Sequence, residues 1–85
     1  MGLNKSNFED KKLVFVTSMK NGNDVKLYSK RPRARIILTM FFVENKTLRE
    51  VGEYFGITGE RIRQLIIKYI KILKYYNNKL EKTDK

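Results

Sequence analysis

The sequence TLREVGEYFGITGERIRQLIIKYIKIL, residues 47–73, decides the fold that we expect for this chain. It predicts a short helix, a tight turn and a longer helix over residues 58–76. Thr47 and Glu50 have the spacing of a capping box, in which each side chain satisfies a backbone amide of the other residue. Gly56 suits the left-handed conformation that ends many helices. The stretch therefore predicts two helices joined by a glycine turn.

Apolar residues recur through this stretch at intervals of three or four, as on one face of a helix. They are Leu48, Val51, Phe55, Ile62, Leu65 and Tyr69. Gly52 lies within the first stripe, where glycine costs roughly 1 kcal/mol relative to alanine. We expect its missing side chain to let the second helix cross closely. The pattern is typical of a helix-turn-helix, and an ordinary helical hairpin with a solvated polar face is the alternative.

The stretch resembles region 4 of the bacterial sigma-70 family. The run ERIRQ at residues 60–64, preceded by TLxEVG at 47–52, is that family's signature, and a weaker similarity extends over residues 32–74. The resemblance implies a mainly α, three-helix helix-turn-helix domain. In the family, the last helix enters the major groove of the minus-35 promoter element. The domain also docks on the β flap of RNA polymerase.

The resemblance implies roles for individual residues of the second helix. Glu60, Arg63 and Gln64 match positions that meet bases and nearby phosphates, and Arg61 matches a position that faces the DNA backbone. Gly59 departs from the pattern, because the family usually has a basic residue there. One guanine or phosphate contact would then be missing, and the promoter sequence would differ from the family's usual one.

The resulting set of predicted DNA-binding residues combines base readers with backbone contacts. It comprises Thr58, Glu60, Arg61, Arg63, Gln64, Lys68, Lys71 and Arg49. By the hydrogen-bonding pattern of the major groove, Arg63 can bind guanine, Gln64 adenine and Glu60 the amino group of cytosine. We expect the remaining cations to bind phosphates and to set the register on the duplex.

The composition favours a polyanionic partner. The 85 residues include 19 Lys and Arg against 9 Asp and Glu, a formal net charge of +10. Cysteine and histidine are absent, which excludes disulfides, thiolate or imidazole metal sites, and Cys–His or Ser–His catalysis. We therefore expect no enzyme, cofactor, metal or small-molecule substrate, and double-stranded DNA as the partner. Without an apolar run of about 20 residues, a membrane partner is not expected either, and we expect a cytoplasmic protein of a bacterial or phage-infected cell.

Positive charge brackets the first helix of the helix-turn-helix. Residues 1–35 hold nine basic and three acidic residues, and residues 58–76 hold five and one. Residues 36–57, in contrast, hold two basic and three acidic residues. Two basic flanks of this kind are expected where a protein straddles a phosphate backbone, although they could also serve only solubility.

The N-terminal part of the sequence predicts a basic arm, residues 1–30, that contains a β-hairpin over residues 13–29. The segment LVFVTSM at residues 13–19 is rich in β-branched and aromatic residues, and Asn21-Gly22 is a strong hairpin-turn signal. Residues 1–12 show no periodicity and are expected to be mobile. A hairpin of two strands is marginal by itself, so it would lean on the helical part or on a partner.

Residues 31–85 are expected to form the helix-turn-helix domain with a polar tail. Its first helix is predicted over residues 32–43, with Pro32 at the first helical position. Arg31, Arg33 and Arg35 oppose the helix dipole there, and they could either be solvated or bind phosphate or polymerase. The tail, residues 77–85, is expected to fray.

The last helix carries more apolar residues than one face needs. Ile66, Ile67 and Ile72 cannot all be buried in so small a core, so either the hairpin covers them or they form an exposed patch for a protein partner. This excess supports an alternative function. The chain would then be an adaptor that binds RNA polymerase or another sigma factor by protein contact and reads DNA little.

Overall fold

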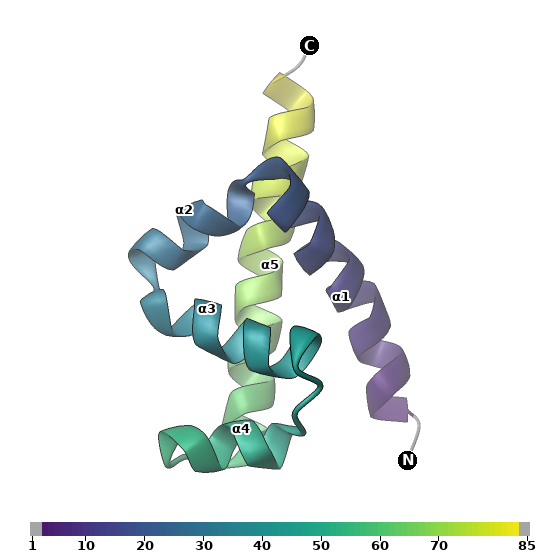
Figure 1. Cartoon of the computed structure of the whole chain (residues 1–85). Coiled ribbons are helices and arrows are strands. Elements are labelled where there is room, and N and C mark those ends of the chain that lie inside the picture. The colour runs from purple at the N-terminus through teal and green to yellow at the C-terminus, as the bar shows by residue number, and fades with distance from the viewer. Residues whose placement is uncertain (1–2, 84–85) are drawn as a thin grey trace.

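Helix α5 is the axis on which the other elements are arranged (Figure 1). The computed structural model describes the backbone of residues 3–83 and the side chains of residues 8–79. The elements are α1 (Leu3–Asn21), α2 (Asn23–Lys30), α3 (Pro32–Leu38), the π-helical turn η1 (Thr39–Val43), α4 (Leu48–Phe55) and α5 (Gly59–Thr83). Over residues 3–83, none of these helices is long and apolar enough to cross a membrane.

The core is built on the apolar face of α5. Helices α1, α2, α3 and α4 all contact α5, and the π-helical turn η1 adds aromatic side chains from α3's end. The buried apolar residues come from every element: Phe8, Phe15, Leu27, Ala34, Ile37, Leu38, Phe42, Val51, Ile62, Ile66, Tyr69, Ile70 and Leu73. The prediction of a mainly helical chain is confirmed.

The predicted β-hairpin over residues 13–29 is wrong, because this segment forms the end of α1 and all of α2. Phe8, Phe15 and Ser18 are buried and recur at helical spacing, so α1 has a face that packs on the core. The turn predicted at Asn21-Gly22 is present. Gly22 has a φ of 80° and turns the chain, but it joins two helices rather than two strands.

Two segments that were expected to lack structure are also helical. Residues 3–12 belong to α1 and residues 77–83 to α5, while residues 1–2 and 84–85 lie outside the described part. Asn77 explains why α5 continues. Its Oδ1 accepts a hydrogen bond from Asn23 Nδ2 at 2.7 Å and lies 3.4 Å from Ser18 Oγ. The turn between α1 and α2 is thereby fixed to the C-terminal half of α5.

The helix predicted over residues 32–43 is present and ends in a π-helical turn. The N–H of Glu44 donates to the carbonyl oxygen of Thr39 at 3.0 Å, the i→i+5 bond of a π-helix. Phe42 stacks on Phe15 with ring centroids 5.3 Å apart, and Phe41 meets Phe8 edge-on at 4.9 Å. The wider turn therefore lets two successive aromatic side chains contact α1.

Two of the three surplus isoleucines of α5, Ile66 and Ile72, pack within the core. Ile66 is buried, and Ile67 and Ile72 are half-buried. Ile67 instead lines a groove beside α1, so neither of the two alternatives that the sequence left open applies to all three residues. The apolar excess of α5 is thus largely used in packing within the chain.

We expect Asn77→Ala to lower the free energy of unfolding by about 1–3 kcal/mol. The change leaves the amide of Asn23, which is 3% exposed, without its acceptor. Urea denaturation followed by circular dichroism measures the effect. Asn78→Ala, at the exposed neighbouring position, is the matched control, and an equal loss in both variants would contradict the role of this hydrogen bond.

We expect the folded chain to lose stability at alkaline pH because of Tyr28 on α2. Burial, reinforced by the nearby carboxylate of Asp24, raises the pKa of Tyr28 to about 12 against the opposing charge of Arg35. Below pH about 10 the phenol is neutral in both states, and its contribution to stability is complete. Between pH about 10 and about 12 only the unfolded chain releases the proton, so stability falls as pH rises.

Tyr28→Phe should therefore reduce the decline in unfolding free energy between pH 9 and pH 11, as measured by urea denaturation at each pH. Tyr54→Phe, at an exposed position of α4, serves as the control. If both variants decline as steeply as the wild type, the burial of the Tyr28 hydroxyl does not govern this pH dependence.

Candidate nucleic-acid interface

The helix-turn-helix begins and ends with the caps that the sequence predicted. The N–H of Glu50 donates to Thr47 Oγ1 at 3.1 Å, and the N–H of Thr47 donates to Glu50 Oε1 at 2.9 Å. Gly56 has a φ of 76° at the C-terminal cap of α4. Thr58 caps α5 by accepting a hydrogen bond from the N–H of Arg61 at 3.1 Å. The capping box and the glycine turn are confirmed, and α5 begins at a defined residue.

Gly52 permits a close contact inside this unit, but with a different neighbour from the one predicted. A Cβ atom on Gly52 would lie 2.5 Å from the carbonyl oxygen of Ile57 and 3.0 Å from the carbonyl carbon of Thr58. The N–H of Ile57 in turn donates to the carbonyl oxygen of Gly52 at 2.9 Å. The backbone of the turn, including Thr58 that caps α5, therefore occupies the space of the missing side chain.

Gly59 brings the first turns of α4 and α5 together. A Cβ atom there would lie 3.2 Å from the nitrogen of Arg49 and 3.3 Å from the carbonyl carbon of Leu48. These backbone atoms belong to the first turn of α4 and cannot move like the tip of a flexible side chain. Close packing thus gives a physical reason for glycine at a position where the resemblance predicted a basic residue.

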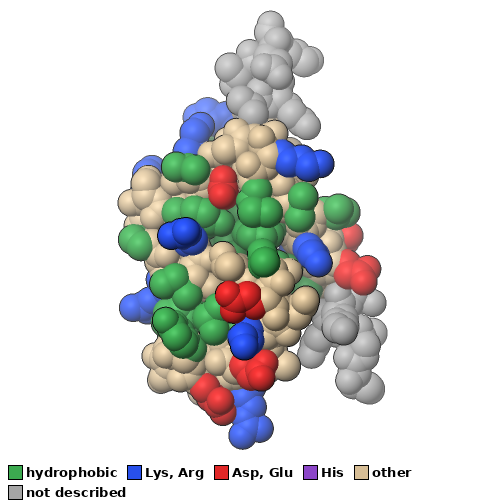
Figure 2. Space-filling model, viewed as in Figure 1, with side chains coloured by type: hydrophobic (Ala, Val, Ile, Leu, Met, Phe, Trp, Pro, Cys, Tyr) green, Lys and Arg blue, Asp and Glu red, His purple; other side chains and the backbone are tan. Residues whose placement is uncertain are grey.

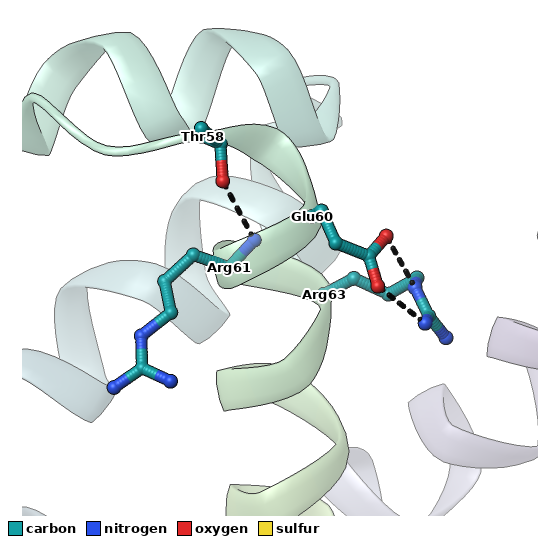
Figure 3. A network of polar contacts seen from close by, with 4 residues as sticks. All are labelled: Thr58, Glu60, Arg61 and Arg63. Carbon is teal, nitrogen blue, oxygen red and sulfur yellow. Dashed lines mark hydrogen bonds and ion pairs between the residues drawn. The ribbon is translucent and has the colours of Figure 1, made fainter.

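A fork of hydrogen bonds joins Glu60 to Arg63 on the exposed side of α5 (Figure 3). Arg63 Nη2 lies 2.6 Å from Glu60 Oε2, and Arg63 Nε lies 3.1 Å from Glu60 Oε1. The hydrogen bond from Arg63 is the main cause that lowers the pKa of Glu60, and the side chain of Gln64 adds a smaller contribution. The same pair raises the pKa of Arg63. The three predicted base readers therefore form one polar cluster.

This cluster can exchange its internal bonds for bonds to another molecule. Both members of the ion pair are exposed, with side-chain exposures of 39% for Arg63 and 59% for Glu60. Exposed pairs of this kind contribute little to stability and are easily rearranged. The guanidinium presents donors and the carboxylate presents acceptors, which together match the two kinds of group on base edges.

The remaining predicted site residues divide between two sides of the recognition helix. Figure 3 shows Arg61 and Arg63 extending in opposite directions from α5. At 3.6 residues per turn, Lys68 lies near the side of Arg61, whereas Lys71 shares the side of Gln64. Arg49 is exposed on α4 and pairs with Glu53 at 3.4 Å. Thr58 acts as a helix cap, so its hydroxyl is already used within the chain.

Arginines at the start of α3 join Arg61 in a cluster that the sequence did not reveal. Burial is the main cause that raises the pKa of Tyr69, and the charges of Arg33, Arg31 and Arg61 oppose it. The positive charges of all three arginines therefore act on the hydroxyl group of the same tyrosine. The sequence proposed a role for the α3 arginines in anion binding, but only the packing of α3 on α5 brings them to Arg61.

The face formed by α2, α3 and α4 has a different character. Figure 2 shows hydrophobic side chains gathered over its middle and acidic side chains toward the α4 end. Ile36 on α3 and Val43 on η1 are 42% and 56% exposed. Within residues 3–83, no group of three His, Cys, Asp or Glu side chains could hold a metal ion. This face is better suited to a protein than to the phosphates of DNA.

Gly52→Ala should destabilise the chain although alanine is the better helix former. The gain in helix propensity is about 1 kcal/mol, but the added methyl group meets a backbone oxygen at 2.5 Å and forces the turn to shift. We expect a net loss of about 1–2 kcal/mol in urea denaturation. Glu53→Ala, at an exposed position of the same helix, is the control. A Gly52→Ala variant as stable as this control would show that the turn has room to relax.

Comparison with known proteins identifies the helix-turn-helix unit. The family described as Sigma-70, region 4 matches residues 31–74, just over half of the 85-residue chain. No solved structure matches the chain. Members of this family bind DNA and RNA polymerase in transcription and are not enzymes. The chain belongs to the sigma-70 region 4 family of DNA-binding helix-turn-helix domains.

Proposed function

We propose that this chain is a transcription regulator, or one part of a divided sigma factor, that reads minus-35-like promoter DNA with α5 in the major groove. One observation carries the proposal. Helix α5 is unbroken from Gly59 onward, and its first turns display Glu60 and Gln64 to solvent while its later turns are held by α1 and α2. A rigid, supported helix with a free polar end is what groove binding requires.

Base readout in this proposal comes from the polar cluster of α5. Arg63 binds guanine through the same two-donor geometry that it now uses toward Glu60. Gln64 binds adenine, and Glu60 accepts from the amino group of cytosine. Gly59 contributes no side chain, so the recognised sequence differs from that of family members with a basic residue at this position.

Backbone contacts come from the cations beside the cluster. Arg61, together with Arg31 and Arg33, is proposed to bind phosphates on one side of the major groove, which the combined effect of their charges on Tyr69 supports. Lys68 and Lys71 on α5 and Arg49 on α4 are proposed to bind further phosphates. We propose that residues 31–85 carry base recognition, while residues 1–30 pack on α5 and share its core.

Contact with the β flap of RNA polymerase is the second part of the proposal. Membership of the family supports it, as does the exposed apolar surface at Ile36 and Val43. The alternative, an adaptor that reads DNA little, drew on surplus apolar residues of α5. Most of that surface is packed against other helices, which favours the DNA reader.

The experiment that tests the function is selection of bound duplexes from a random pool, with and without core RNA polymerase. A DNA reader enriches one sequence in both selections, and its affinity falls steeply with salt concentration. Enrichment of no sequence in either selection would contradict base readout. Capture of polymerase together with indiscriminate DNA binding would support the adaptor.

Two substitutions in α5 should separate base readout from backbone binding. We expect Arg63→Ala to reduce the preference for the selected duplex over one altered at a single base pair, roughly five- to hundredfold. Lys68→Ala should weaken binding to selected and scrambled duplexes alike, because a phosphate contact carries no sequence information. Fluorescence anisotropy at several salt concentrations measures both. Equal losses on both duplexes for Arg63→Ala would exclude Arg63 as a base reader.

A further inference from the structure

A groove runs between α1 and the middle of α5. The family match covers the α5 side of this groove but not the α1 side. It has a volume of about 320 Å³. Val14, Ile67 and Ile70 line it with apolar atoms, and the cations Lys11, Lys71 and Lys74 line it together with Asp10. We call this set of residues the α1–α5 groove. It joins α5, which carries the proposed base readers, to a helix that the family pattern did not predict.

The α1–α5 groove continues the face that bears the proposed base readers. At 3.6 residues per turn, Arg63, Gln64 and the groove residues Ile67, Lys71 and Lys74 lie within roughly 100° of the circumference of α5. Figure 3 shows Arg63 extending from α5 on the side where the α1 ribbon lies. A duplex that meets Arg63 and Gln64 therefore lies on the same side of α5 as the groove.

The distances along α5 match the width of the DNA groove. With a rise of about 1.5 Å per residue, Lys71 and Lys74 lie roughly 10 and 15 Å beyond Gln64 along the helix axis. The major groove is about 12 Å wide, so side chains at these positions reach the phosphates that border it. When the base readers lie in the major groove, Lys71 and Lys74 therefore lie near the edge of that groove.

The charge of the α1–α5 groove favours an anion. Three lysines face one aspartate, and Lys71 and Lys74 are exposed without an ion-pair partner among the described residues. Arg61 and the arginines of α3 lie on the other side of α5. One cationic surface therefore lies beside the base readers, and the other lies beyond them along α5.

We propose that the α1–α5 groove binds the phosphate backbone of DNA, with Lys11 and Lys74 as contacts in addition to Lys71. This inference rests on the proposed function, because it assumes that α5 enters the major groove. It gives α1 a direct part in DNA binding besides its part in the core. The negative charge of Asp10 repels the bound phosphate and limits the affinity of the groove for DNA.

The test compares Lys11→Gln/Lys74→Gln with Lys20→Gln/Lys26→Gln, which removes the same charge elsewhere. Lys20 lies on the opposite side of α1 from Lys11 by helical geometry, and Lys26 lies over the ring of Tyr76, away from the groove. Fluorescence anisotropy with the selected duplex and a scrambled duplex, at four or more salt concentrations, gives the affinity and its salt slope. Circular dichroism checks that both variants are folded.

We expect the groove variant to weaken binding to both duplexes by the same factor and to reduce the salt slope by about 2, at roughly 0.9 per phosphate contact. The control should keep the wild-type slope apart from a small uniform change. Asp10→Asn should have the opposite sign and tighten binding to both duplexes severalfold, because it removes a negative charge beside the phosphate.

Wild-type affinity and slope in the groove variant would overturn the inference, while sequence-selective binding by the wild type would leave the proposed function intact. Loss of binding to core RNA polymerase with unchanged DNA binding would also overturn it and would assign the groove to a protein partner. A wild-type chain that binds no duplex would overturn both proposals together.

Discussion

The burial of one face of α5 is the interaction on which the rest of the structure depends. Ile62, Ile66 and Leu73 on this face have no exposed surface, and α1, α2, α3 and α4 all supply residues that cover it. Helices α2, α3 and α4 have seven or eight residues each, too few to be stable in isolation. They therefore gain most of their stability from packing on α5. The same helix must leave part of its first turns exposed if these are to meet another molecule. Helix α4 packs on the first turns of α5, and Glu60 and Gln64 remain exposed there.

Backbone contacts at two glycines fix how α4 sits on the start of α5. The turn at Ile57 and Thr58 fills the space that a side chain on Gly52 would need, and the first turn of α4 comes close to Gly59. Contacts between backbone atoms leave less freedom than contacts between flexible side chains. The relative orientation of the two helices is consequently determined close to the polar cluster of Glu60, Arg63 and Gln64. A defined orientation matters because the hydrogen bonds that distinguish bases require specific geometry.

The distribution of charge follows from the arrangement of the helices around α5. Packing of α3 on α5 lets the charges of Arg31 and Arg33 act with that of Arg61 on Tyr69, and packing of α1 brings Lys11 to the groove that Lys71 and Lys74 line. The acidic residues Glu50 and Glu53 lie on α4 instead. Six of the 19 basic residues thus belong to two groups, one that includes Arg61 and one that includes Lys71. In the function that we propose, these cations provide affinity for the duplex, and the polar cluster discriminates between bases.

The sequence by itself determined the helix-turn-helix, because its signals are local: a capping box at Thr47, a left-handed glycine at Gly56 and apolar spacing along α4 and α5 depend only on near neighbours in the chain. The candidate base readers followed from the same stretch and its family resemblance.

The fold of residues 1–30 could not be predicted in this way. Its β-branched residues favour a strand locally, and Lys11 and Ser18 interrupt the helical stripe of Phe8 and Phe15. Only tertiary packing made this segment helical. As a helix it contacts the apolar face of α5 and the aromatic pair on η1, and a local sequence pattern does not contain these contacts. The same packing decided which cations lie together, because residues distant in sequence are brought together only by the fold.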